Sequence, residues 1–175
     1  MNRRLDALSR ALTLTAVGLP LLSSSAAAQE EPRGASFELF GGASAIYSSD
    51  QGLSVHTDTF GVRGGFHLTR IWTVEAQLSQ SRHDRLLLNG EVSAKAYLFQ
   101  ADRFRFFALA GPGIQYEYVA GDAGVSGTVH AGIGAEIDLT AKTYLRPEVR
   151  ARWYGDHLGG RDYTLDHTLG FGWRF

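Results

Sequence analysis

Hydrophobic and polar side chains alternate along most of the chain after residue 34, with a period of two residues. This period is typical of β-strands, in which successive side chains point to opposite faces of a sheet. No helical spacing stands out in the same region. We therefore predict eight strands separated by turn residues, at 35–48, 54–68, 72–82, 90–99, 104–118, 127–138, 143–154 and 163–175.

The third, fourth, sixth, seventh and eighth predicted strands show the alternation most clearly, and the seventh serves as the example. Arg146, Glu148 and Arg150 occupy one of its faces, and Val149 and Ala151 occupy the other. The fifth predicted strand is less regular, because residues 104–110 are apolar on both faces. We expect a β-bulge at residues 111–113 that reverses the direction of the side chains there.

The predicted connections differ in length from one end of the strands to the other. Those after the second, fourth and sixth strands are short, whereas those after the third, fifth and seventh are longer and rich in Gly, Asp or Asn. An up-and-down barrel in an outer membrane has this asymmetry, with tight turns on the periplasmic side and longer loops outside.

The N-terminal segment has the three parts of a secretory signal peptide: a basic start with three arginines, a mostly apolar run at 11–22 and small residues at 23–28. The apolar run is too short to cross a bilayer, which takes roughly 20 residues. We expect residues 1–28 to be a cleaved signal peptide, 29–34 a short polar leader and 35–175 the β-barrel.

Composition narrows the class of protein further. The 175-residue chain contains no cysteine, which excludes disulfides and a lipid anchor on cysteine. Its formal net charge is −1 and becomes more negative once the basic signal segment is removed. A strongly basic surface is therefore absent, and we expect no nucleic-acid partner.

The polar faces carry acids and bases in nearly equal number. A soluble lipocalin-like barrel would turn this face to water, whereas an outer-membrane barrel would enclose it. We predict an enclosed network, because a closed interior must neutralise its own charges. Its predicted members are Glu38, Arg63, Glu75, Lys95, Glu117, Glu136, Arg146, Glu148, Arg150 and Arg152, within a wider polar set that adds Glu91, Arg105, Asp138, Asp166 and Arg174.

Aromatic residues gather near the predicted strand ends, as in the girdles of membrane barrels. They are Tyr47, Trp72, Phe104, Tyr118, Tyr144, Trp153, Tyr163 and Trp173. The chain ends on Phe171, Trp173 and Phe175, which alternate in the last strand. With the leader, this ending resembles that of small eight-stranded outer-membrane barrels of the OmpA/OmpX-like and opacity-porin type.

The resemblance covers residues 29–175 and implies an architecture more than an activity. It implies that Phe171, Trp173 and Phe175 form the signal read by the outer-membrane assembly machinery. The implied partners are also periplasmic chaperones, outer-membrane lipid and lipopolysaccharide, with an unknown partner at the cell surface. We expect an all-β, eight-stranded antiparallel transmembrane barrel in the outer membrane with a structural or surface-interaction role.

Three other functions stay open: a small transport or permeability barrel, a lipid A-modifying enzyme, and the soluble periplasmic barrel. Residues 152–157 loosely resemble barrel lipid A deacylases, but the His-x-Ser spacing of that family is missing after His157. His83 and Asp84 with Asp156 and His157 are the best metal candidate. Lipopolysaccharide phosphates would suit Arg82, Arg85 and Arg161. None of these patterns is specific, and we predict no catalytic residue, cofactor or metal site.

Overall fold

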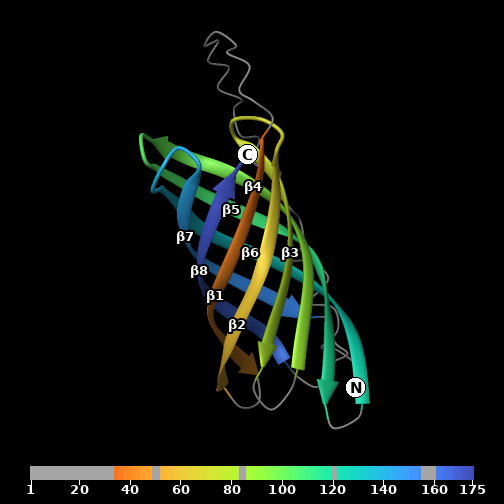
Figure 1. Cartoon of the computed structure of the whole chain (residues 1–175). Helices are drawn as coiled ribbons and strands as arrows, with labels where there is room; N and C mark the ends of the chain where they lie inside the picture. The colour runs from red at the N-terminus through yellow and green to blue at the C-terminus, as the bar shows by residue number, and fades with distance from the viewer. Residues whose placement is uncertain (1–33, 49–51, 83–85, 120–121, 155–160) are drawn as a thin grey trace, which may run out of the picture. The chain divides into compact units, whose positions relative to one another are not determined.

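The computed structural model describes residues 34–48, 52–82, 86–119, 122–154 and 161–175, which form one closed antiparallel β-barrel (Figure 1). Each strand pairs with its neighbours in the sequence, and the first strand pairs with the last. No helix among these residues is long and apolar enough to cross a membrane. The strands are β1 (Ala35–Ser48), β2 (Gly52–His67), β3 (Trp72–Arg82), β4 (Leu86–Ala101), β5 (Phe104–Val119), β6 (Asp122–Asp138), β7 (Thr143–Tyr154) and β8 (Arg161–Arg174).

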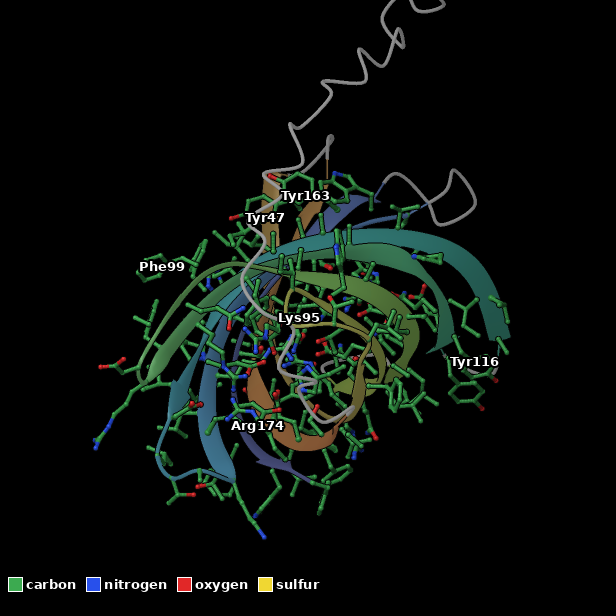
Figure 2. The ribbon with its side chains drawn as sticks, turned by 90° about the horizontal axis from the view of Figure 1, so that it is seen from above. Tyr47, Lys95, Phe99, Tyr116, Tyr163 and Arg174 are labelled. Atoms are coloured by element: carbon green, nitrogen blue, oxygen red, sulfur yellow. The ribbon has the colours of Figure 1, made fainter. Side chains whose placement is uncertain are left out.

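The alternation in the sequence becomes an inside and an outside. Burial alternates along β3. Thr73, Glu75 and Gln77 are buried, whereas Val74 and Leu78 on the opposite face are exposed. Figure 2 views the barrel from above and shows the same division. Lys95 lies within the ring of strands, and Phe99 and Tyr116 lie outside it. The predicted eight-stranded up-and-down barrel is confirmed.

The outer surface is apolar over most of the barrel. Leu78, Ile114 and Val125 each keep more than three fifths of their side-chain surface exposed, whereas Glu38 and Lys95 keep 1%. A soluble barrel would bury the first group and expose the second. The soluble lipocalin-like alternative is therefore wrong, and the enclosed charged interior is confirmed.

The strands are longer than predicted at the end of the barrel where residues 49–51, 83–85, 120–121 and 155–160 connect them, called the loop end below. There β4 begins at Leu86 rather than residue 90, and β6 begins at Asp122 rather than residue 127. Asn89 and Gly90 look like turn residues, but their backbones pair with both β3 and β5. The prediction of longer connections after β3 and β5 is therefore wrong.

The irregularity expected in β5 lies in β4 instead. Residues 107, 109, 115 and 117 of β5 all face inward, so the side-chain direction does not reverse at 111–113. The register shifts between Tyr97 and Phe99 of β4, where Leu98 and Phe99 are both exposed. Residues 106–110 are apolar on both faces because Phe107 and Leu109 pack inside the barrel with Tyr97.

The aromatic prediction holds for most of its residues and fails for Tyr144. Trp72, Tyr118 and Trp153 are exposed on the outer surface, but Tyr144 is 1% exposed and lies inside. Its ring occupies space left by Gly172, where an added Cβ would lie 2.2 Å from the ring. Tyr47 and Tyr163 stack with ring centroids 4.8 Å apart (Figure 2).

Candidate functional site, a charged network inside the barrel

Glu148 of β7 is the centre of the interior network, because three guanidinium groups contact its carboxylate. Arg63 Nη2 lies 3.1 Å from Oε1, Arg150 Nη2 lies 2.8 Å from Oε1, and Arg146 Nη2 lies 2.5 Å from Oε2. Arg146 and Arg150 come from the same face of β7, two residues to either side of Glu148, and Arg63 comes from β2. Contacts therefore cross the barrel as well as following one strand.

Glu75 of β3 extends the network toward the end of the barrel that carries the turns 68–71, 102–103 and 139–142, called the turn end below. Arg146 donates two hydrogen bonds to this carboxylate, 2.6 Å to Oε2 and 2.9 Å to Oε1. Lys95 Nζ lies 3.1 Å from Glu75 and 2.8 Å from Glu136. Tyr97 also donates to Glu136, at 2.9 Å.

The turn end closes with a four-membered group of charges. Arg174 contacts Glu136 at 2.7 Å and Asp138 at 2.8 Å. Arg105 contacts the same two carboxylates at 3.0 and 3.3 Å. This group joins β5, β6 and β8, so it ties the last strand to the rest of the barrel.

On the other side of Glu148, Glu91 and Asp166 continue the network toward the loop end. Glu91 accepts from Arg150 and, at 2.5 Å, from Arg152 Nε. Arg152 Nη2 lies 2.9 Å from Asp166, which accepts a 2.6 Å hydrogen bond from the Ser44 hydroxyl. Glu91 and Asp166 thus link β4, β7, β8 and β1.

Glu38 is positioned by glycine as much as by its cations. It forms an ion pair with Arg63 and lies 3.6 Å from Arg146. A Cβ added at Gly170 would lie 2.1 Å from Glu38 Oε1, so a larger residue there would displace the carboxylate. The two glycines of β8 therefore leave room for large inward side chains, Gly170 for Glu38 and Gly172 for Tyr144.

Aromatic rings cover several of the cations. The guanidinium of Arg63 lies 4.0 Å from the centre of the Phe40 ring, and that of Arg146 lies 4.4 Å from Phe107. Arg174 lies 4.3 Å over Tyr144. Cation–π contacts of this kind stabilise charges that have lost their hydration.

All ten predicted network residues are buried on the inner face of the barrel. Glu117 is buried on β5, opposite Leu87 of β4 and Gly124 of β6. The alternation could not reveal the contributions of Phe40, Tyr97, Phe107 and Tyr144, since apolar rings on a polar face look like irregularities.

A second feature missed from the sequence is a Ser–His–Glu arrangement beside the network. Ser93 Oγ lies 2.7 Å from His130 Nε2, and Glu91 Oε1 lies 3.8 Å from His130 Nδ1. Serine hydrolases use this order of groups. Here all three side chains are at most 3% exposed, and Glu91 is engaged by two arginines. The arrangement is a buried polar contact that joins β4 to β6.

Among the candidate loop residues for binding a metal or lipopolysaccharide, the structure describes the side chain of Arg82 alone. Arg82 is exposed at the end of β3, and the side chains of His83, Arg85, His157 and Arg161 lie outside the described ones. No group of three or more His, Asp or Glu among the described residues is arranged to hold a metal ion.

A closed eight-stranded barrel with its charges enclosed and its apolar side chains outward defines the class of protein, and comparison with known families agrees. Residues 14–175 match the model of the outer membrane protein beta-barrel domain. The chain belongs to this family. It is thus an outer-membrane β-barrel protein with a buried charged interior.

Solved structures show the same fold at low sequence identity. Neisserial surface protein A has a TM-score of 0.70 at 12% identity, covering 81% of this chain and 97% of that one. The N-terminal barrel of Pseudomonas aeruginosa OprF has a TM-score of 0.66 at 14% identity, covering 82% and 98%. Ail of Yersinia pestis has a TM-score of 0.61 at 15% identity, covering 82% and 99%. A comparison with curated protein sequences found no match.

Proposed function

We propose that this protein is a closed membrane scaffold with a structural or surface-interaction role, and that its interior passes no solute. The network around Glu148 carries the proposal, because its ion pairs join side chains from both halves of the barrel across the interior. An eight-stranded barrel encloses a space that side chains can fill. A solute would have to separate several buried ion pairs, and breaking one such pair costs roughly 3–5 kcal/mol.

Planar-bilayer recording tests the closed interior directly. We expect the purified, folded protein to give no discrete current steps in potassium chloride. A double variant that shortens two central cations, Arg146→Ala with Arg150→Ala, serves as the comparison, because it removes bulk and charge at the middle of the barrel. Reproducible openings of the unmodified protein would contradict the proposal and favour the transport alternative.

The surface-interaction role rests on the loop end, which faces away from the two chain ends of the barrel. Ail of Yersinia pestis has been crystallised with the heparin analogue sucrose octasulfate. The loop-end connections of this chain contain three acids, Asp50, Asp84 and Asp156, and one base, Arg85. This balance does not favour a sulfated or phosphorylated ligand, so we propose a surface partner of another kind. An epitope inserted between Gly159 and Gly160 should be stained on intact cells, whereas staining only after lysis would contradict this orientation.

The assembly machinery and periplasmic chaperones are further proposed partners. Phe175 supports this, because its side chain is 81% exposed beyond the end of β8. Phe171 and Trp173 pack edge to face with centroids 4.6 Å apart. Phe171 and Trp173 lie on β8 where it pairs with β1 and closes the barrel, and the N–H of Phe175 donates to the carbonyl of Ala35.

A further inference from the structure

Two of the three turns at the turn end have the same structure. In the first, the Thr69 hydroxyl accepts hydrogen bonds from the backbone N–H groups of Ile71 at 3.2 Å and Trp72 at 3.0 Å. In the second, the Thr140 hydroxyl accepts from Lys142 and Thr143, both at 3.1 Å. Side-chain capping of this kind fixes the backbone of a tight turn.

Hydrogen bonds also join the turns to one another. Gln100 Nε2 donates to the carbonyl of Arg70 at 2.9 Å, which links turn 68–71 to the end of β4, next to turn 102–103. The carbonyl of Arg103 accepts from Asp138 N, and that of Lys142 accepts from Arg174 N, both at 2.8 Å. The three turns and the end of β8 therefore form one connected rim (Figure 1).

Each turn of this rim presents a basic side chain. Arg70, Arg103 and Lys142 are all exposed, and Asp102 is the single acid in the three turns. The loop-end connections have the opposite balance, with three acids to one base. The connections at the two ends of the barrel thus differ in charge, and those of the turn end are the more basic.

The same turns expose large apolar side chains beside the bases. Leu68, Ile71 and Leu139 are each about half exposed, at 53%, 52% and 49%. Trp72 and Phe104 lie on the outer surface at the adjoining strand ends. Apolar side chains beside exposed bases are typical of the boundary between acyl chains and headgroups. At a surface that contacts only water or a polysaccharide, exposed leucine and isoleucine would gain no burial.

We propose that the turn end is a binding surface for anionic phospholipid headgroups, with Arg70, Arg103 and Lys142 contacting the phosphates. Leu68, Ile71 and Leu139 enter the acyl region between them. The hydrogen-bonded rim fixes the backbones of the turns that carry the three bases, so the turns need not reorder when lipid binds. This surface is separate from the interior network and from the loop end.

Spin-labelled lipids test the proposal in phosphatidylcholine vesicles that contain the folded protein. Electron paramagnetic resonance gives the preference of the barrel for spin-labelled phosphatidylglycerol over spin-labelled phosphatidylcholine. We expect a preference of about fivefold, roughly what one base near an anionic surface contributes. It should fall to near unity in the variant R70Q/R103Q/K142Q and weaken with added salt. The matched control is Arg82→Gln, which removes an exposed base at the loop end and should leave the preference unchanged.

Two results would overturn the proposal. One is equal affinity of the unmodified protein for both lipids, or a preference that Arg82→Gln lowers as much as the triple variant does. The other is loss of binding to purified peptidoglycan in the triple variant with unchanged lipid preference, which would assign the bases to that polymer. The Gln substitutions retain the backbone and threonine hydrogen bonds of the turns, and a gel-mobility shift on heating verifies that each variant is folded.

Discussion

Glu148 shows at the scale of one residue how the interior is stabilised. A buried carboxylate is costly unless its lone pairs are used, and here Arg63, Arg146 and Arg150 all donate to it. Removing it leaves three buried cations with fewer partners. The other carboxylates near them, such as Glu75, are already engaged and cannot move without breaking their own contacts.

We therefore expect Glu148→Ala to lower the free energy of unfolding by about 3–5 kcal/mol. Urea unfolding in detergent or lipid measures this loss. Asp102→Ala is the control, because it removes an exposed acid at the turn end and should cost no more than about 1 kcal/mol. A similarly small cost for Glu148→Ala would mean that its charges are hydrated in the folded protein.

Sequence alternation predicts which residues face inward but not which of them pair. The period of two assigns Glu38, Arg63 and Glu148 to the polar face, since each is flanked by apolar residues. Their contact depends on the stagger between strands that are far apart in the sequence. It also depends on Gly170, whose missing side chain makes room for Glu38. Neither the stagger between distant strands nor the space beside Gly170 can be predicted from the alternation within a single strand.

At the scale of strands, the pairing of β4 with β5 depends on a close approach of their backbones. A Cβ added at Gly111 of β5 would lie 1.9 Å from the carbonyl oxygen of Val92 and 2.9 Å from the Cα of Ser93. Only a residue without a side chain fits at this distance. The prediction of a β-bulge at 111–113 was therefore wrong about the role of Gly111. The sequence shows that a glycine is present, but it does not show which backbone atoms lie opposite it.

Gly111→Ala should separate β4 from β5 and destabilise the barrel by at least about 1–3 kcal/mol, as overpacking does in other interiors. The heat-dependent gel-mobility shift of the folded barrel should weaken or disappear. Gly64→Ala is the matched control, since nothing lies within 4 Å of its added Cβ. Equal behaviour of the two variants would show that β4 and β5 adjust to the added carbon.

At Phe175, where β8 meets β1, an effect on assembly in cells can be measured separately from an effect on the stability of the folded barrel. The N–H of Phe175 donates to the carbonyl of Ala35 at 2.9 Å, while its ring is largely exposed. Phe175→Ala keeps this hydrogen bond and removes the ring. We expect its unfolding free energy in vitro to change by less than about 1 kcal/mol.

In cells, the same variant should reach the outer membrane at a clearly lower level, as measured by immunoblotting of envelope fractions. This result would follow if the terminal aromatic residue is read during assembly. Normal outer-membrane levels would contradict the assembly signal. A large loss of stability in vitro would instead indicate a structural role for the ring.

At the scale of the whole molecule, the fold was the most predictable feature, because eight alternating segments allow few closed arrangements. The side of the barrel that faces lipid was predicted from three features together: the balanced charges of the polar face, the aromatic residues near the strand ends and the alternating aromatic residues of the last strand. The ends were predicted less well. Asn89, Gly90 and residues 122–126 resemble turns in composition, but they pair with neighbouring strands, so β4 begins at Leu86 and β6 begins at Asp122.

Two outward-facing positions, one in β6 and one in the turn after it, probe the depth of the barrel in the membrane. Ile133 lies on the outer face of β6, opposite Ala108 of β5 and Val149 of β7, within the apolar band. Leu139 follows β6 in the turn, where headgroups should lie. An arginine near the bilayer midplane of such a barrel costs about 2–4 kcal/mol, and near the interface about 0–1. Reversible urea unfolding in lipid vesicles should therefore show a much larger loss for Ile133→Arg than for Leu139→Arg. Equal costs would mean that the two positions lie at the same depth, and a larger cost at Leu139 would move the hydrocarbon region toward the turn end.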